Sequence, residues 1–174
     1  IYNSYNSGRV YAFSSVDQTA ESFHPAAGGI AGEAERIYNC VNYGKVESAS
    51  NYVGGIVGEG VDVRYSYNYG DVSGQNCVGG IVGKSIKWSA TIAENCYNYG
   101  DVKATGDYAG GVVGFYDGFT GAYCAKVVYS GNYGDIAAGD GAGGIMGGTN
   151  YGEIYYSFNR GNLASGGATG GILG

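Results

Sequence analysis

The sequence has very little proline and few charged residues for its length. One proline stands against 36 glycines in 174 residues, and 14% of the residues are charged. A disordered low-complexity chain usually carries more proline and more charge, and collagen needs glycine at every third position, which is not the pattern here. The chain therefore belongs to neither class, and its apolar share of 44% allows a buried core.

Histidine and cysteine are also scarce. His24 is the only histidine and no Cys-x-x-Cys occurs, so neither a zinc site nor a cofactor is expected. Cys40 and Cys96 hold the same position two repeats apart. Two strand spacings of about 4.8 Å exceed the ~7 Å Cα separation that a disulfide tolerates, so a disulfide framework is not expected. A pairing of Cys96 with Cys124 through an insert stays open as an alternative.

Positive charge and long apolar runs are missing too. The nine basic residues are scattered and the formal net charge is −6, whereas phosphate binding needs clustered Lys and Arg, so nucleic acid is not an expected partner. No run of about 18 apolar residues exists, so we expect no membrane span in this segment. No signal peptide is recognisable, and the chain opens and closes on repeat motifs. We therefore expect it to be a segment of a longer protein.

What the sequence does contain is a repeat of two short motifs. The second motif, Gly-Gly-[Ile/Val]-apolar-Gly, recurs at intervals of 26, 25, 31, 33 and 27 residues. A fixed core with inserts of variable length is typical of a solenoid. The first motif, Asn-x-Gly-x-aliphatic, occurs six times, with its asparagines at Asn6, Asn42, Asn68, Asn98, Asn132 and Asn159.

The motifs predict strands rather than helices. They are rich in Tyr, Val and Ile and are interrupted by Asn-x-Gly or Gly-Gly every few residues. We predict an all-β fold, a parallel β-solenoid in which each repeat of 25–33 residues forms one coil. The whole chain, 1–174, would be a single domain of about six coils, roughly 30 Å long at ~4.8 Å per coil. Inserts are expected at 11–27, 84–95 and 115–128.

Stacking would place equivalent residues above one another. The six asparagines would form a column whose amides hydrogen-bond to one another and to turn backbone, while the glycines supply positive φ or close backbone approach. Side-chain alternation separates the remaining residues into two sets. Ser66, Asn68 and Val72 would point inward, and Tyr67 and Tyr69 outward. The opposite orientation would bury the tyrosines and fits the residue sizes less well.

The two motifs resemble the GLUG-motif repeats, which are named for a Gly-hydrophobic-Gly signature. The matching residues are Gly55-Ile56-Val57-Gly58, Gly80-Ile81-Val82-Gly83 and the tract Cys96-Tyr97-Asn98-Tyr99-Gly100-Asp101-Val102. The resemblance covers essentially the full chain. It implies a bacterial secreted or cell-surface protein, often a large adhesin-like chain or the non-catalytic part of an immunoglobulin-A-cleaving peptidase. It supplies no catalytic residues, and no His-Glu-x-x-His is present.

Three aspartates form the one candidate metal site. Asp71, Asp101 and Asp135 share one position in consecutive repeats. Such a column could bind calcium, because carboxylates at a spacing of ~5 Å repel one another without a counterion. Lys45 and Asn162 occupy the position in neighbouring repeats, and the calcium-binding Gly-Gly-x-Gly-x-Asp motif is absent. A solvated surface is the favoured interpretation.

Aromatic side chains form the candidate ligand or partner face. Tyrosine columns could stabilise neighbouring strands, contact another chain, or stack on sugar rings. The inserts 84–95 and 115–128 leave the same turn of successive coils, so they could form an aromatic lip beside Lys84 and Lys87. The insert 11–27 leaves a different turn and could cover the first coil. The face comprises Tyr67, Tyr69, Tyr97, Tyr99, Tyr133, Trp88, Phe115, Tyr116 and Phe119.

These features favour a structural function. We expect a stalk, spacer or fibre-forming module of a bacterial extracellular or cell-surface protein, which stacks end to end on itself or on neighbouring repeats because open strand edges need partners. The alternative is an adhesin module that binds glycans or surface proteins. An enzyme is not expected, because a fold alone confers no activity. A polysaccharide-processing enzyme would have to use the aspartate column or Asp107 with Asp117.

Overall fold

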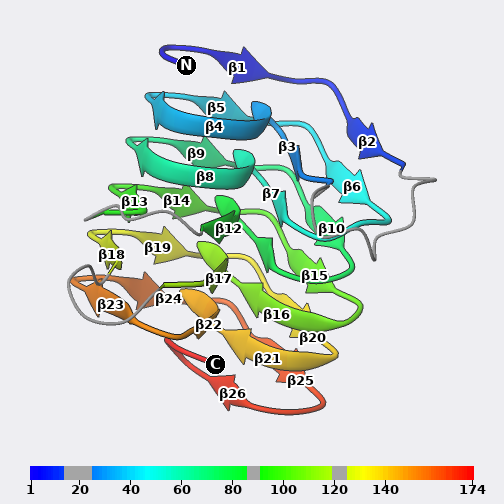
Figure 1. The fold of residues 1–174 in the computed structure, drawn as a ribbon, viewed down its shortest axis with the longest axis vertical. Coiled ribbons are helices and arrows are strands. Elements are labelled where there is room, and N and C mark those ends of the chain that lie inside the picture. Colours follow the sequence, from blue (N-terminus) through cyan, green and yellow to red (C-terminus); the bar gives the residue numbers. More distant parts are fainter. Residues whose placement is uncertain (14–24, 86–90, 119–124) are drawn as a thin grey trace.

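The chain winds into coils that stack along one axis, with the two termini at opposite ends (Figure 1). The structure, a computed structural model, describes residues 1–13, 25–85, 91–118 and 125–174. The described residues form short strands and turns with no helix, and all pairing between the strands is parallel. The predicted all-β parallel solenoid is therefore confirmed. We call the strands contributed by one repeat a rung.

The six copies of the first motif, Asn-x-Gly-x-aliphatic, form two six-stranded sheets. The asparagine sheet ends each strand on the motif asparagine and contains, in order, β1 (Tyr5–Asn6), β5 (Val41–Asn42), β9 (Tyr67–Asn68), β14 (Tyr97–Asn98), β19 (Gly131–Asn132) and β24 (Phe158–Asn159). The valine sheet begins each strand on the motif aliphatic residue and contains β2 (Val10–Ala12), β6 (Val46–Ser48), β10 (Val72–Gly74), β15 (Val102–Ala104), β20 (Ile136–Ala138) and β25 (Leu163–Ser165).

The Gly-Gly motif builds the other two sheets. The glycine sheet contains β3 (Ala27–Gly28), β7 (Val53–Gly54), β11 (Val78–Gly79), β16 (Asp107–Gly110), β21 (Asp140–Gly143) and β26 (Thr169–Gly170). The wide sheet contains β4 (Ala31–Tyr38), β8 (Val57–Arg64), β12 (Val82–Ser85), β17 (Val113–Tyr116), β22 (Met146–Thr149), β13 (Ala93–Glu94), β18 (Ala125–Val128) and β23 (Gly152–Tyr155).

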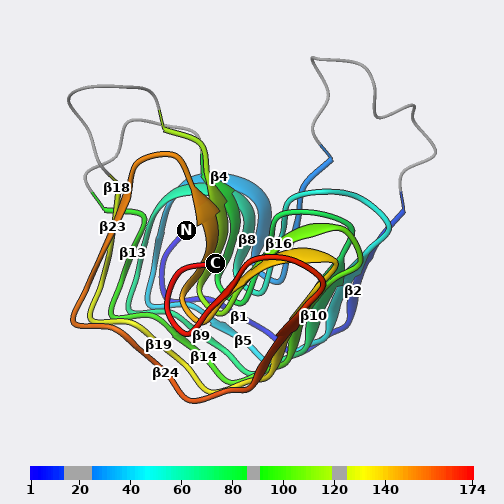
Figure 2. The ribbon, with the colours of Figure 1, turned by 90° about the horizontal axis from the view of Figure 1, so that it is seen from below.

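The register is set by the motifs. Asn68 pairs with Asn98, and Val72 pairs with Val102, so equal motif positions lie on top of one another. Seen along the axis, the coils superpose, with the asparagine and valine sheets meeting at a corner (Figure 2). The second to fifth rungs lie between two neighbours, so the enclosed solenoid has about four turns. The prediction of about six coils is too high for enclosed coils, because it included both open end rungs.

The inserts are shorter than predicted. β8 runs unbroken through the second rung, whereas in the third and fourth rungs the equivalent strand is divided into β12 and β13, and into β17 and β18. The predicted inserts 84–95 and 115–128 therefore include residues of the wide sheet at both ends, namely the end of β12 and all of β13, and the end of β17 and all of β18. They do leave the same turn of successive rungs. In the same way, 11–27 includes the end of β2 and the start of β3.

The corners of the coil use non-glycine residues. The residue three positions before each motif asparagine has a positive φ of 49–54°, and these residues are Asn3, Asn39, Tyr65, Asn95, Tyr129 and Tyr156. Gly141 is the only described glycine in this region of φ. Of the two roles expected for the motif glycines, positive φ or close backbone approach, the described motif glycines do not use positive φ.

The motif glycines instead permit close approach between rungs. A Cβ on Gly70 would overlap the carbonyl oxygen of Gly44 in the preceding rung. A Cβ on Gly55 would overlap the side chain of Asn68, because the second glycine of the Gly-Gly motif lies directly against the motif asparagine. Glycine is needed at both positions because backbone and amide side chain occupy the space of a methyl group.

Two separate apolar clusters form the interior. One combines the wide sheet with Cys40 and Cys96, and includes Ile56, Ile81 and Ile145. The other joins the valine and glycine sheets. Their branched aliphatic residues recur at equal positions in successive rungs, so each rung buries its apolar side chains against the next. A single rung could not do this alone.

Candidate functional site

A chain of hydrogen bonds joins the six motif asparagines. Nδ2 of each of the first five donates to Oδ1 of the asparagine in the next rung, at 2.7–2.9 Å. The other amide hydrogen of Asn68 reaches the carbonyl oxygen of Gly70 at 2.7 Å, and the other rungs repeat this bond. Asn42, Asn68, Asn98 and Asn132 have no exposed surface. The predicted asparagine column is confirmed, and its buried amides have their donors satisfied.

A second inward column holds small polar residues. The backbone N–H of Cys40 donates to Ser66 Oγ, and that of Cys96 donates to Ser130 Oγ, each at 3.2 Å. Both cysteines are fully buried and unpaired. Burial raises the pKa of the Cys96 thiol to about 12, so it stays protonated and unreactive at neutral pH. This column is structural.

Two further cysteines lie outside that column. Cys77 is unpaired and buried, and its burial raises the pKa of its thiol to about 11. Since Cys96 is unpaired, the alternative disulfide between Cys96 and Cys124 is not formed. Cys124 lies outside the described residues, as do His24, Lys87, Trp88 and Phe119, so the other expectations that involve them stay predictions.

The outward tyrosines stack on one another. In the column of Tyr43, Tyr69, Tyr99 and Tyr133 the ring centroids are 5.3, 4.7 and 4.8 Å apart and the ring planes differ by 9°, 6° and 6°. The predicted outward orientation is confirmed, with 37–57% of each side chain exposed. The two faces of Tyr69 and Tyr99 are covered by neighbouring rings. A sugar stacks on a free aromatic face, so this geometry favours mutual stabilisation over glycan stacking.

A shorter aromatic column runs beside the first. Tyr67 and Tyr97 stack at 5.8 Å, and the next rung has Gly131 at this position. Phe158 fills that gap, since a Cβ on Gly131 would overlap its ring. The Phe158 ring lies 6.3 Å from Tyr97 and meets Tyr133 edge-on at 5.3 Å. The predicted face omitted Phe158, although a glycine in an aromatic column is a signal that a neighbouring ring occupies its space.

Partial burial also affects the phenols of these columns. It raises the pKa of Tyr97 and of Tyr99, and the neighbouring tyrosines add to the increase. Both phenols therefore stay neutral at physiological pH. The face presents neutral hydroxyl groups rather than charges.

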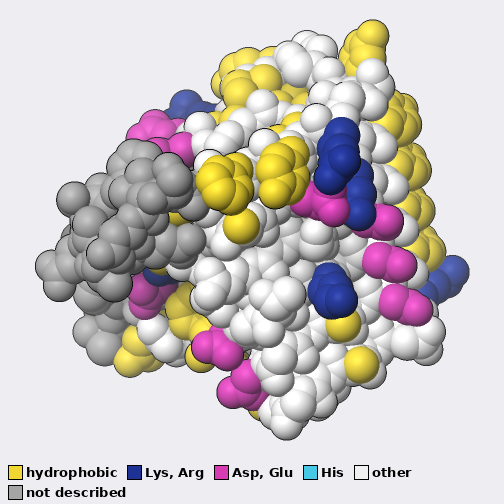
Figure 3. Space-filling model, turned by 90° about the vertical axis from the view of Figure 1, so that its right-hand side faces the viewer, with side chains coloured by type: hydrophobic (Ala, Val, Ile, Leu, Met, Phe, Trp, Pro, Cys, Tyr) yellow, Lys and Arg dark blue, Asp and Glu magenta, His cyan; other side chains and the backbone are white. Residues whose placement is uncertain are grey.

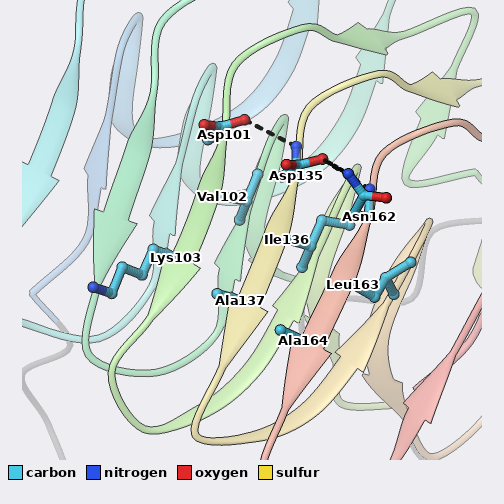
Figure 4. A pocket seen from close by; sticks show the side chains of 9 residues that line it. All are labelled: Asp101, Val102, Lys103, Asp135, Ile136, Ala137, Asn162, Leu163 and Ala164. Atoms are coloured by element: carbon cyan, nitrogen blue, oxygen red, sulfur yellow. Dashed lines mark hydrogen bonds between the residues drawn. The ribbon is translucent and has the colours of Figure 1, made fainter.

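The aspartate column hydrogen-bonds to the backbone of the following rung. Oδ1 of Asp71 accepts the N–H of Asp101 at 3.1 Å, and Oδ1 of Asp101 accepts the N–H of Asp135 at 2.9 Å. Asp135 in turn accepts the backbone and side-chain N–H groups of Asn162 at 2.8 and 2.9 Å (Figure 4). The carboxylates thus bind backbone donors. No group of three potential metal ligands occurs among the residues that the structure describes.

Charge along this column changes sign. Arg9 and Lys45 occupy the position in the first two rungs, and each forms an ion pair with Glu47. Figure 3 shows acidic side chains in a row along this side of the molecule, beside a row of hydrophobic side chains, with basic side chains above the acidic row and also level with it. The change of sign therefore belongs to this one column, which is basic in the first two rungs and acidic in the next three.

A shallow pocket of about 290 Å³ lies on the outside of the valine sheet. Asp101, Asp135 and Asn162 stand along one side, where they bond to one another's backbone (Figure 4). Small side chains, Ala137 and Ala164, leave the space open. The pocket follows from small residues on a flat sheet, and no convergent set of polar groups faces it.

The predicted aromatic lip is only partly present in the described residues. Tyr116 was expected to be exposed, but it is 2% exposed and belongs to the apolar interior. Tyr116 pairs with Ser85, the last residue of β12, and Ser85 is also buried. The side chains at this strand position therefore point into the interior. Phe115 does face outward and packs on Tyr108 at 4.6 Å.

The candidate catalytic carboxylates have other partners. Asp117 lies 3.5 Å from Lys84 Nζ and accepts a hydrogen bond from Asn150 at 3.0 Å. Lys84 lies over the ring of Tyr52 at 4.8 Å. Asp107 is exposed, and its backbone N–H donates to Asn76. The described contacts of Asp117 join it to no second carboxylate. Asp107 pairs in register with Asp140 of the next rung, but the Asp140 carboxylate accepts the backbone N–H groups of Gly141 and Ala168.

One charged cluster was not predicted from the sequence. On the wide sheet, Arg64 Nε lies 2.7 Å from Asp62 Oδ1, and its guanidinium lies 3.2 Å from Glu94 and 5.7 Å from the ring of Tyr38. The Tyr38 hydroxyl donates to Asp62, which raises the pKa of Tyr38. Tyr38, Arg64 and Glu94 hold equal positions in three rungs, so the cluster joins these rungs from outside.

Comparison of the chain with models of known families finds no match, and comparisons with curated proteins and with solved structures find none either. The resemblance to the GLUG-motif repeats therefore stays a prediction. The described part of the chain contains no helix that could cross a membrane.

Proposed function

We propose that the chain is a structural repeat module, a stalk, spacer or fibre-forming segment of a bacterial extracellular or cell-surface protein. The observation that carries this proposal is the continuity of the asparagine column from Asn6 to Asn159. Every rung is bonded to its neighbours by side chains as well as by backbone. Such an object resists bending and holds its two ends at a fixed separation.

The outer columns support the same role. The stacked tyrosines, the aspartates that accept backbone N–H groups and the cluster at Arg64 all connect a rung to the next one. None of these groups converges on a common point in space as the groups of a catalytic site do. We therefore propose a non-catalytic, adhesin-like role in which the rod positions other parts of its parent protein. The bacterial surface location rests on the resemblance of the motifs.

The experiment measures the distance between the end rungs. Ser7 and Arg160 hold the same motif position in the first and sixth rungs. Spin labels are attached at these two positions after Cys40, Cys77, Cys96 and Cys124 are replaced by serine, and the distance is measured by double electron–electron resonance. Five intervals of ~4.8 Å predict a narrow distribution near 24 Å between the labelled backbones, with label tethers adding a few Å.

The same labelled chain in denaturant is the control, and it should give a broad distribution. A broad distribution in native buffer would show that the rungs do not hold a fixed separation, and it would reject the spacer function.

A further inference from the structure

Two glycines lack a role within the described chain. At the glycine of the first motif, Gly44, Gly70, Gly100, Gly134 and Gly161 would each place a Cβ onto the carbonyl oxygen of the equivalent glycine in the preceding rung. Gly8 holds this position in the first rung. A Cβ there would meet only Asn6 Oδ1, at an ordinary 3.6 Å. Its φ is not in the left-handed region.

The other end shows the same pattern in the opposite direction. At the second glycine of the Gly-Gly motif, a Cβ would overlap the carbonyl oxygen of the equivalent glycine in the following rung, at Gly29, Gly55, Gly80, Gly111 and Gly144. Gly171 holds this position in the last rung, and no described atom lies within 4 Å of a Cβ there. Glycine at 8 and 171 is therefore required only if another rung stacks on each end.

The asparagine column gives the two ends matching polarity. Each Nδ2 donates toward the C-terminal side. Asn159 Nδ2 donates to Gly161, with no asparagine beyond it in the described chain. Asn6 Oδ1 accepts the N–H of Gly8, with no asparagine before it. At the C-terminal end the Asn159 amide can thus donate to a further rung, and at the N-terminal end the Asn6 carbonyl oxygen can accept from one.

The apolar interior also continues to both ends. Ile172 and Leu173 in the last rung are 41% and 43% exposed. Ile30 and Ala31, which hold the equivalent motif positions in the first rung, are only partly buried. Stacking the last rung on a first rung would cover Ile172 with Ile30 and the larger Leu173 with the smaller Ala31. That would remove apolar side chains from water at both ends.

We propose that the C-terminal rung docks onto the N-terminal rung of a second copy of this chain, head to tail and in the register of the internal repeats. Asn159 Nδ2 then donates to Asn6 Oδ1 of the second copy. Oδ1 of Asn162 accepts the backbone N–H of Arg9 of the second copy, as Asp135 accepts that of Asn162 within the chain. This inference rests on the structural function proposed above and names its partner.

Docking of this kind does not close on itself. The two surfaces that meet are different, so each added copy presents a new C-terminal rung, and the contact propagates as a filament. Unpaired strand edges favour such addition. The two glycines are what make the contact specific, because a methyl group at either position would strike the carbonyl oxygen of the docked rung.

The test uses sedimentation velocity of the full chain over a range of concentrations. Wild type should form a concentration-dependent series of species. Gly8→Ala blocks the N-terminal end and Gly171→Ala blocks the C-terminal end, so each variant alone should be monomeric, with association weakened by about a hundredfold or more. An equimolar mixture should stop at dimers, because Gly8→Ala retains its C-terminal end and Gly171→Ala its N-terminal end.

Ser7→Ala is the matched control, since its side chain faces outward beside Gly8, and it should assemble like wild type. Circular dichroism melting of all variants checks that each is folded. Wild type that stays monomeric at every concentration, or glycine variants that assemble like wild type, would overturn the proposal. A monomer that still gives the narrow spin-label distance would leave the spacer function intact and reject docking alone.

Discussion

Asn98 and Asn132 are 34 residues apart in the sequence, yet Nδ2 of Asn98 donates a hydrogen bond of 2.7 Å to Oδ1 of Asn132. Both side chains are fully buried. Asn98 Oδ1 in turn accepts from Asn68. Bonds in such a chain polarise one another in a medium of low dielectric, and each asparagine is both donor and acceptor. The loss of one member therefore leaves unpaired groups on both sides of it.

Asn98→Ala should be strongly destabilising. The replacement leaves Asn68 Nδ2, Asn132 Oδ1 and the carbonyl of Gly100 without their partner in a buried site. Buried unsatisfied groups cost about 1–3 kcal/mol each, so the free energy of unfolding should fall by roughly 3 kcal/mol or more. Urea denaturation measures it. Asn6→Ala, in the half-exposed first rung, is the control and should cost about 1 kcal/mol. Equal losses would show that the column contributes nothing beyond local bonding.

Gly100→Ala should prevent normal stacking. Its Cβ would overlap the carbonyl oxygen of Gly70, and both atoms belong to backbone that is fixed by neighbouring rungs. We expect a fall in the free energy of unfolding of about 3 kcal/mol or more, in the range of severe core overpacking. Thermal melting followed by circular dichroism measures the change, at a concentration at which wild type is monomeric, with Gly8→Ala as the control that should then melt like wild type because a Cβ at Gly8 meets only Asn6 Oδ1, at 3.6 Å. A normal melting temperature for Gly100→Ala would contradict the close packing of the rungs.

Asp101→Asn should be tolerated and Asp101→Ala should not. An amide keeps an oxygen that can accept the N–H of Asp135, as Asn162 shows that the position accepts an amide, and it removes repulsion between carboxylates. The alanine variant loses the acceptor, which should cost about 1 kcal/mol. Denaturation with calcium and with chelator compares the two variants with wild type. Stabilisation of wild type by calcium that Asp101→Asn abolishes would instead establish a metal site.

Tyr99→Ser should destabilise the rod, whereas Tyr99→Phe should be nearly neutral. Tyr99 stacks on Tyr69 and on Tyr133, and each aromatic pair contributes about 0.5–1.5 kcal/mol. The serine variant should therefore lose roughly 2 kcal/mol, measured by urea denaturation, while phenylalanine keeps the ring. The glycan alternative is checked on a glycan array. Binding by wild type that vanishes when Tyr69, Tyr99 and Tyr133 are all serine would show that the face recognises sugars.

Stability should decrease at alkaline pH. Burial raises the pKa of the Cys96 thiol to about 12, whereas an unfolded cysteine titrates near ~8.5. The folded chain thus holds this proton more tightly. Its stabilising effect is complete below the unfolded pKa and is lost as the pH rises toward 12.

Cys96→Ser isolates that effect. Serine occupies the same column at Ser66 and Ser130, so this variant should fold normally. The free energy of unfolding, measured from pH 7 to 11 in reducing buffer, should fall less steeply for Cys96→Ser than for wild type. Tyr99 titrates with a raised pKa in both proteins, so its contribution cancels in the difference. The contribution of Tyr97 cancels except for the part of its raised pKa that comes from Cys96, which is the smallest of its causes. Parallel curves would contradict the burial of a protonated thiol.

The stacking of the coils, and which side chains point inward or outward, could be predicted from the sequence. Equal motifs predict equal register, and the two-residue period of a strand then places Asn68 inward and Tyr69 outward. These features follow from local rules that each repeat obeys. The corners were harder to predict, because Tyr65 adopts a positive φ that favours glycine or asparagine, and only three of the six residues at this position, Asn3, Asn39 and Asn95, are asparagines.

The inserts were predicted least well, because their boundaries depend on how far each strand after the Gly-Gly motif stays paired with the equivalent strand of the neighbouring rung. Ser85, Tyr116 and Thr149 each lie six residues after the first glycine of the Gly-Gly motif, and they pair in the structure. Counting from that motif would have shown that Tyr116 continues a strand and shares a column with the small residue Ser85. The aromatic ring of Tyr116 suggested a binding loop, but its strand position directs the side chain into the apolar interior.

The most direct test of this structure is hydrogen exchange of the asparagine side-chain amides, followed by NMR. The amide hydrogens of Asn42, Asn68, Asn98 and Asn132 should exchange about a hundredfold or more slowly than in the unfolded chain, because exchange requires the rungs to open. At a concentration at which the chain is monomeric, those of Asn6 and Asn159, in the end rungs, should exchange faster than the interior four. Rapid exchange at all six would contradict a continuous buried column, and with it the rod on which the proposed function depends.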